Sequence, residues 1–168
     1  MKITIGECDP AIHAETILAT RNKEILNTTI VYENNPQDMD FMLNWFRERQ
    51  QKGFPILGAF DEKGSLLGYA SYNTFKSPTG YNHTVEHGVF VIEGQHGKGI
   101  GKMLMAELIN RARQAGMHTM LAFIDDTNAE SIGFHKKLGF EYCGKIKQAG
   151  RKFGRWLDVV IYQYMLEK

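Results

Sequence analysis

The sequence predicts an α+β fold around a mixed, mostly antiparallel sheet. Short apolar or alternating stretches of strand type recur along the whole chain, and two longer stretches carry apolar residues at helical spacing. Two of the strand-type stretches are joined by four turn residues, which is typical of an antiparallel hairpin. The 168 residues, 43% of them hydrophobic, suit one domain with a substantial core.

The first part of the chain begins with a strand and two helices. Ile3 and Ile5 alternate with polar residues, as in a first strand, and Asp9–Pro10 can cap a helix that runs from about Ala11 to Leu26. A second helix is predicted from Asp38 to Gln51, because its apolar positions fall on one face.

Strands and a loop follow. Ile56 to Phe60 and Leu66 to Tyr72 are predicted strands, and Asp61 to Gly64 is the turn between them. Phe75 to His83 is polar and contains proline and glycine, so it is predicted to be a loop. Thr84 to Ile92 has the character of another strand.

The second half contains a long helix from Lys102 to Ala115, which Gly116 closes. The strands on either side of this helix are expected to form a parallel pair. The other predicted elements are a buried strand at Met120–Asp125, a short helix at Asn128–Leu138 that Gly139 ends, and closing strands at Phe140–Ile146 and Leu157–Leu166.

Composition limits the class of protein. The 20 basic and 19 acidic side chains give a formal charge of +1, so no basic excess favours nucleic acid as a partner. The N-terminus lacks the apolar core of a signal peptide, and apolar runs such as Met120–Ile124 are too short to span a bilayer. We therefore expect no membrane partner and a cytoplasmic protein. Cys8 and Cys143 form no metal or redox motif, and Cys143 is expected to be a small core residue.

The segment His96–Gly101 has three glycines in five residues, between a predicted strand and the long helix. Glycines let the backbone approach a ligand, and the start of a helix presents unpaired N–H groups to anions, above all phosphates. His96 and Met103 break the Walker pattern, and Lys102 or Leu104 stands where a dinucleotide fingerprint needs glycine. The remaining choices are another phosphate-bearing ligand or a simple flexible turn.

His96–Gly101 resembles the Arg/Gln-x-x-Gly-x-Gly/Ala signature of the GNAT N-acetyltransferase superfamily, with His96 replacing the usual first residue. Asn128–Phe140 is similar to the family's Asn-led helix that ends in Leu-Gly-Phe. Gly68–Tyr72, Thr84–His87 and Gly150–Val159 are similar to the phosphinothricin and methionine sulfoximine N-acetyltransferase branch. The resemblance implies one GNAT domain over residues 1–168, with helices on both faces of the sheet.

The same resemblance implies acetyl-CoA as cosubstrate, no metal, and a homodimer that acetylates the α-amino group of a small amino-acid analogue. We expect direct transfer in a ternary complex. Strand backbone would pair with the pantetheine arm, and loop amides would hold the pyrophosphate. The residues implied for acetyl-CoA are Val89, Phe90, Val91, Gly97, Lys98, Gly99, Ile100, Gly101, Lys102, Asn128 and Lys137. The simpler alternatives are core valines, solvated lysines and, for Asn128, a helix N-cap.

Two residues are implied as catalytic. Glu86 would accept a proton from the substrate ammonium, directly or through water, and a raised pKa from partial burial would suit that role. Its alternative is a surface glutamate in an ion pair. His135 stands where many superfamily members have a tyrosine that protonates the departing thiolate, and imidazole titrates near neutral pH. Its alternative is a packing histidine.

The substrate is expected near the loop that follows residue 75. The implied contacts are Lys76, Thr79, Gly80, Tyr81 and Tyr32, with Trp156 as a further wall. Lysine lacks the bidentate fork with which arginine grips a carboxylate. His83 and His87, four residues apart on one strand, would lie roughly 13 Å from each other, too far to share one ion.

Two other functions remain open from the sequence. The acceptor could be a polyamine or a peptide N-terminus, although a cationic acceptor would favour acidic residues and the Phe75–His83 loop has none. The protein could also be a non-catalytic acyl-CoA-binding regulator, which predicts that Glu86→Gln changes nothing.

Overall fold

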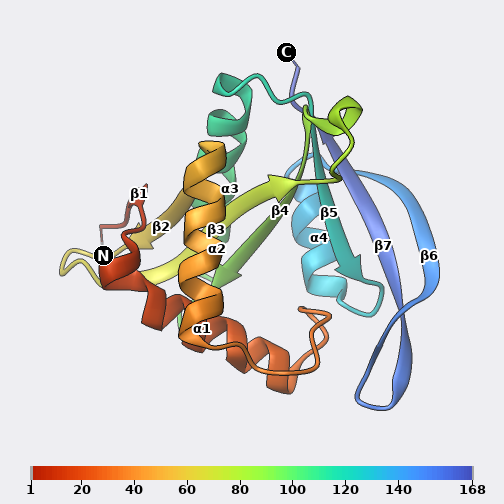
Figure 1. Cartoon of the computed structure of the whole chain (residues 1–168), viewed down its shortest axis with the longest axis horizontal. Coiled ribbons are helices and arrows are strands. Elements are labelled where there is room, and N and C mark those ends of the chain that lie inside the picture. The colour runs from red at the N-terminus through yellow and green to blue at the C-terminus, as the bar shows by residue number, and fades with distance from the viewer. Residues whose placement is uncertain (1, 168) are drawn as a thin grey trace. The chain divides into compact units, whose positions relative to one another are not determined.

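The computed structural model describes residues 2–167, which fall into two compact units. Unit 1 contains residues 2–20, 37–73 and 87–116, and unit 2 contains residues 21–36, 74–86 and 117–167. The elements, labelled in Figure 1 except for η1, are β1 (Thr4–Glu7), α1 (Pro10–Asn27), α2 (Met39–Lys52), β2 (Ile56–Phe60), β3 (Leu66–Thr74), the 3₁₀ turn η1 (Thr79–Tyr81), β4 (Thr84–Val91), α3 (Ile100–Gln114), β5 (Thr119–Asp125), α4 (Ala129–Lys137), β6 (Glu141–Lys152) and β7 (Arg155–Met165).

Unit 1 is an antiparallel meander with helices on both faces. Strand β1 pairs with β2, and β2 pairs with β3. Because neighbouring strand residues point to opposite faces, Tyr69 and Gly68 identify what covers each side. Tyr69 belongs to a buried cluster with residues of α1 and α2, whereas a Cβ at Gly68 would lie 3.1 Å from Ile100 Cγ2 of α3. In Figure 1 the orange helix α2 accordingly crosses the near face of β2 and β3.

Local signals fix the helix ends of this unit. Asp38 caps α2, since its Oδ1 accepts a hydrogen bond of 2.8 Å from Phe41 N, and Gly53 ends the helix in the left-handed region at φ 67°. Gly116, with φ 74°, follows α3 as predicted.

Unit 2 contains the parallel pair. The start of β4 runs parallel to β5, with Val85 opposite Met120. Strand β5 pairs antiparallel with β7, and β7 pairs antiparallel with β6. The strand order β1-β2-β3-β4-β5-β7-β6 is therefore a mixed, mostly antiparallel sheet, as predicted.

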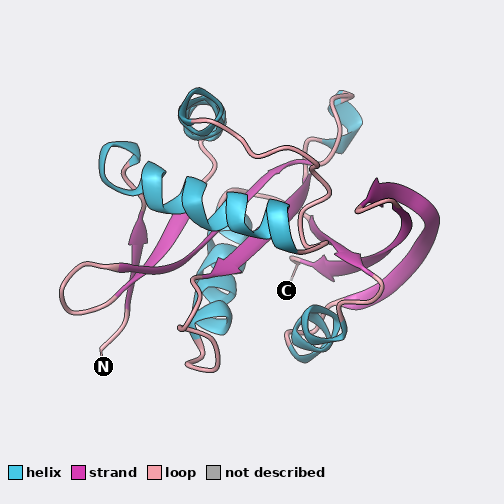
Figure 2. Cartoon of the chain, turned by 90° about the horizontal axis from the view of Figure 1, so that it is seen from below, coloured by secondary structure: helices cyan, strands magenta, loops and turns pink. Residues whose placement is uncertain are grey.

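The prediction for β6 was wrong in length, because this strand continues from Ile146 to Lys152. Its side chains are almost all exposed, so the strand has no apolar alternation by which to recognise its second half. Two irregularities in the pairing with β7 also interrupt the period of two. Phe153 and Gly154, both in the left-handed region, make the turn, and Figure 2 shows the hairpin curving along its length.

The two cysteines lie in contrasting surroundings. Cys8 is buried in the unit 1 core, and desolvation raises the pKa of its thiol to about 12, with a smaller contribution from Glu7. The prediction of a core position for Cys143 was wrong: it is exposed, because it lies at an irregularity between Tyr142 and Gly144 on β6. Within residues 2–167, no helix has the length and apolar character needed to cross a membrane.

Candidate active site

The glycine loop of unit 1 has the backbone of an anion site. Gly94, Gly97 and Gly99 all have φ 78°, and a Cβ at any of them would meet nothing within 4 Å. Gly99 is the N-cap of α3, which begins at Ile100, two residues earlier than predicted. No side chain in the described part of the chain caps this helix, and its first turn holds no acid. The first N–H groups of α3 thus face the loop without a capping side chain.

The other unit 1 residues implied for the cofactor lie on β4 and around the loop. Val89, Phe90 and Val91 are half-buried. The two valines are therefore more exposed than core residues would be, which was the simpler alternative for these positions. Phe90 stacks on Tyr69, with 5.0 Å between ring centroids. Lys98 Nζ donates to Gln95 Oε1 at 2.7 Å.

Glu86 lies on the unit 2 part of β4, opposite Leu121 in the parallel pair. Its side chain is exposed rather than partly buried, yet neighbouring protein atoms desolvate the carboxyl and raise its pKa. A carboxylate with a raised pKa binds a proton more readily than an ordinary glutamate does, which suits a general base.

His135 is buried on α4, with 3% of its surface exposed. Its Nδ1 lies 2.7 Å from the Ser131 carbonyl oxygen, which can only accept, so Nδ1 carries the proton in the neutral ring. Phe140 packs edge-on against the imidazole, with 5.1 Å between centroids. Burial lowers the pKa of His135, and the bond to Ser131 opposes that shift in part. Both alternatives for this residue, packing and proton transfer, are compatible with these contacts.

Asn128 begins the same helix. Its Oδ1 accepts a hydrogen bond of 3.0 Å from Ser131 N, so it serves as the N-cap of α4. Ser131 thus links Asn128 at the start of the helix to His135 one turn later. Lys137 is exposed at the other end of α4.

The loop after β3 folds into an aromatic cluster within unit 2. The Phe75 ring meets Tyr81 edge-on at 5.6 Å and stacks on Phe123 at 6.0 Å. Lys76 Nζ lies over the rings of Phe75 and Tyr81, at 5.2 and 5.6 Å from their centroids. Thr79 and Gly80 are exposed in the 3₁₀ turn. The loop therefore presents the ammonium group of Lys76 above a cluster of aromatic rings.

Tyr32 and Trp156 differ in their surroundings. The Tyr32 hydroxyl lies 2.9 Å from Asp125 Oδ2 and 3.0 Å from the Asp158 carbonyl oxygen. Trp156 has 60% of its surface exposed, and the Arg151 guanidinium lies over its ring at 5.4 Å. The sequence indicated neither Asp125 nor this hydrogen bond, because the partners are 93 residues apart.

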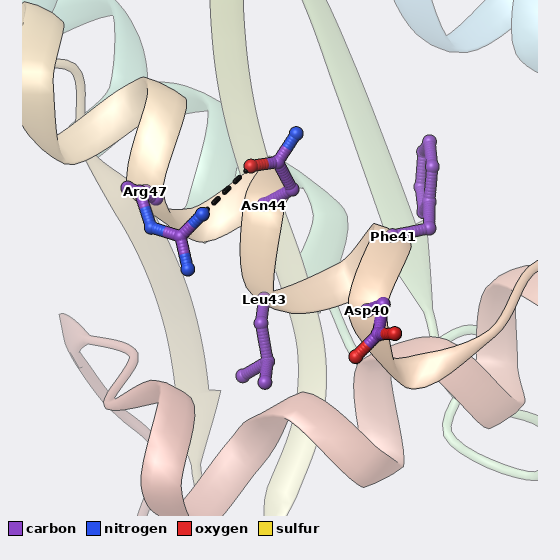
Figure 3. Close-up of a pocket in the computed structure, with 5 residues that line it drawn as sticks. All are labelled: Asp40, Phe41, Leu43, Asn44 and Arg47. Atoms are coloured by element: carbon purple, nitrogen blue, oxygen red, sulfur yellow. Dashed lines mark hydrogen bonds between the residues drawn. The ribbon is translucent and has the colours of Figure 1, made fainter.

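The site residues divide between the units. The glycine loop and residues 89–91 belong to unit 1, whereas Glu86, His135, Asn128, Lys137 and the acceptor-side residues belong to unit 2. Residues 2–167 contain no group of three or more His, Cys, Asp or Glu side chains placed to hold a metal ion. A pocket on α2, shown in Figure 3, is lined by Asp40, Phe41, Leu43, Asn44 and Arg47 and includes none of these residues.

Each comparison with known proteins finds acetyltransferases. Residues 19–140 match the model of the acetyltransferase (GNAT) family. An L-methionine sulfoximine/L-methionine sulfone acetyltransferase of Pseudomonas aeruginosa is 46% identical over 90% of this chain and 88% of its own length. A phosphinothricin N-acetyltransferase of Alcaligenes faecalis is 33% identical, over 80% of this chain and 68% of its own. A solved structure from Salmonella typhimurium, described as a putative acetyltransferase with its cofactor acetyl-CoA, has a TM-score of 0.94 at 38% identity and covers 100% of this chain and 96% of its own.

Proposed function

Because the chain belongs to the GNAT acetyltransferase family, we propose that it transfers the acetyl group of acetyl-CoA to the α-amino group of a small amino-acid analogue of the methionine sulfoximine, methionine sulfone or phosphinothricin type. The observation that carries the proposal is the 46% identity to a relative named for two of these acceptors. The cationic, acid-free loop at residues 75–83 supports it, since an amino acid brings a carboxylate with its amine.

Glu86 is the proposed general base. The acceptor arrives as an ammonium ion, and its nitrogen must lose a proton before its lone pair can attack the thioester carbonyl. Glu86 takes that proton, directly or through water. Attack forms the C–N bond. Collapse of the tetrahedral intermediate then breaks the C–S bond and releases the thiolate of CoA, while the nitrogen gives its second proton to solvent and becomes the amide N–H. The acetyl group passes directly between the two substrates in a ternary complex.

His135 is the proposed acid that protonates the thiolate. Burial lowers the pKa of its imidazolium, which makes the charged ring a stronger acid but a rarer form at pH 7. The hydrogen bond from Nδ1 to Ser131 keeps the ring oriented, and Nε2 is the nitrogen that we propose exchanges the proton.

Binding is assigned to the two substrates separately. The amides at the start of α3, with Lys98 and Lys102 nearby, would hold the pyrophosphate of acetyl-CoA, while β4 backbone and Asn128 would contact the pantetheine. Lys76 would pair with the acceptor carboxylate, and Thr79, Gly80, Tyr81 and Tyr32 would surround the acceptor. We also infer a homodimer, the assembly typical of the branch that this chain resembles.

The proposal is tested by release of free thiol from acetyl-CoA. The panel holds methionine sulfoximine, methionine sulfone and phosphinothricin, with a polyamine and a short peptide as the other acceptor classes. We expect turnover with at least one of the three amino-acid analogues. Turnover with the polyamine or peptide alone would move the chain to another acceptor, and no turnover with any compound would overturn the proposal.

A further inference from the structure

Two buried charged side chains of unit 2 hold the same short segment. Residues 28–36, here called the strap, follow α1. Lys152 is 2% exposed, and its Nζ donates to the carbonyl oxygen of Val31 at 2.7 Å. Asp125 is 4% exposed, and its Oδ2 accepts from the hydroxyl of Tyr32 at 2.9 Å. Burying a lysine and an aspartate is costly unless both are well paired, so these contacts define where the strap lies.

Close packing against β6 also holds the Tyr32 ring in place. A Cβ at Gly150 of β6 would lie 2.6 Å from Cδ2 and 2.9 Å from Cε2 of this ring, closer than real Cβ contacts. Only glycine therefore allows the ring to lie against β6 at this point. The hydroxyl also reaches the Asp158 carbonyl oxygen on β7, so Tyr32 is fixed by packing along one side and by hydrogen bonds at its tip.

Asp125 uses its other oxygen on the turn that leads into α4. Oδ1 accepts from the backbone N of Thr127 at 2.9 Å and from its hydroxyl. The Asp125 carbonyl oxygen accepts from Asn128 N at 3.0 Å, and Asn128 caps α4. Thr29 of the strap also forms a side-chain hydrogen bond with Asp125. One buried carboxylate thus holds the strap through Tyr32 and Thr29, and it holds the start of the helix that carries His135 through Oδ1.

We propose that Asp125 is a positioning residue that fixes the acceptor-side tyrosine, Tyr32, and the His135 helix at the same time. The inference rests on the proposed function for the roles of those two residues. It predicts that the two branches can be separated, because Tyr32→Phe removes the hydroxyl that bonds Oδ2 and leaves the bonds from Thr127 to Oδ1 in place. Asp125→Ala removes both accepting oxygens, so it releases the partners on both sides.

The kinetic test uses purified full-length variants with the acceptor that turns over. Tyr32→Phe should raise the acceptor KM about three- to tenfold, the range for losing one hydrogen bond, with kcat and the acetyl-CoA KM unchanged. Asp125→Ala should raise the acceptor KM at least as much and also lower kcat by about tenfold, with a shifted pH dependence of kcat. The KM effects should be less than additive in the double variant, because both changes remove the bond between Tyr32 and Asp125.

Matched variants separate position from general damage. Gly150→Ala should raise the acceptor KM as Tyr32→Phe does, whereas Gly144→Ala in the same strand should not, since nothing lies within 4 Å of a Cβ at that position. Tyr142→Phe, on an exposed tyrosine of β6, controls for loss of a phenol. Additive effects of Tyr32→Phe and Asp125→Ala on KM, or equal kcat values for both single variants, would overturn the proposal.

Amide hydrogen exchange gives a readout that needs no turnover. Asp125→Ala should speed exchange both in the strap and in residues 127–135, whereas Tyr32→Phe should speed it in the strap alone. If the wild-type protein acetylates no compound in the panel, the proposed function fails, yet the exchange pattern still decides whether Asp125 holds both segments. Unchanged exchange at residues 127–135 in Asp125→Ala would show that it does not.

Discussion

The two residues proposed for proton transfer carry pKa shifts of opposite sign with the same first cause. Desolvation penalises the charged form of each group, so it raises the pKa of the Glu86 carboxyl and lowers that of the His135 imidazole. The shift at Glu86 moves its pKa toward the neutral range, where a general base works best. The shift at His135 moves its pKa away from that range, so the protonated ring is a stronger acid but a rarer form at pH 7.

Replacing the proposed base provides the sharpest test at a single residue. Glu86→Gln keeps the size of the side chain but cannot accept a proton, so kcat should fall by ~10²-fold or more while acetyl-CoA binding is retained. Steady-state kinetics with calorimetric titration of acetyl-CoA measures both. Glu141→Gln, another exposed strand glutamate, is the matched control and should leave kcat unchanged. An unaltered rate in Glu86→Gln would remove Glu86 as the general base.

At the scale of elements, the approach to α3 depends on backbone that only glycine adopts easily. Gly99→Ala should raise the acetyl-CoA KM by about tenfold, because a left-handed alanine at φ 78° costs about 1–2 kcal/mol and distorts the amides that face the anion.

The control for this prediction is Gly53→Ala, at the end of α2. Gly53 has φ 67° and open space around it, so its substitution introduces comparable backbone strain away from the loop. Thermal unfolding should show similar losses of stability for both variants, with the KM change confined to Gly99→Ala. Equal acetyl-CoA KM values for the two variants would show that the loop does not bind the cofactor.

Elements with local signals were predictable, and those fixed by distant partners were not. The caps Asp38 and Asn128 and the glycines after α2 and α3 act on residues within one turn, so the sequence indicates them directly. The second half of β6 pairs with β7 without an apolar period, and its extent depends on pairing across a hairpin. The sequence did not indicate the hydrogen bonds of Asp125 and Lys152, because their partners lie 93 and 121 residues away in the chain.

For the whole molecule, the buried histidine links stability to pH. Above pH 6.5 the ring is neutral in both the folded and the unfolded chain. As the pH falls below that value, the unfolded chain binds a proton at His135 that the folded chain accepts only at lower pH, so the free energy of unfolding decreases. Urea unfolding at pH 7.5 and pH 5.5 should show this loss.

The contribution of His135 is obtained by subtraction. His135→Gln should lose less stability than the wild type between the two pH values, whatever its stability at pH 7.5. An identical loss in both proteins would assign the pH dependence to other groups.

Assembly is the second property at this scale. Ile146, Phe153 and Trp156 are large exposed apolar residues on the hairpin of β6 and β7, and β6 ends the strand order. If this hairpin joins two copies of the chain, light scattering should give twice the mass of one chain for the wild type and a single-chain mass for Trp156→Glu. Ile12→Glu, on a residue with 70% of its surface exposed, is the matched control and should remain dimeric. A dimeric Trp156→Glu protein would move the interface elsewhere.

Because the two cysteines differ in exposure, thiol labelling can measure how fast the unit 1 core opens. An aromatic disulfide reagent should label Cys143 at once, because this thiol is exposed. Cys8 has a pKa of about 12 and only 7% of its surface exposed, so we expect its labelling to be limited by the rate at which the unit 1 core opens. A native sample should therefore consume one equivalent of reagent in a burst and the second slowly, and the slow phase times the opening of unit 1 without any added probe.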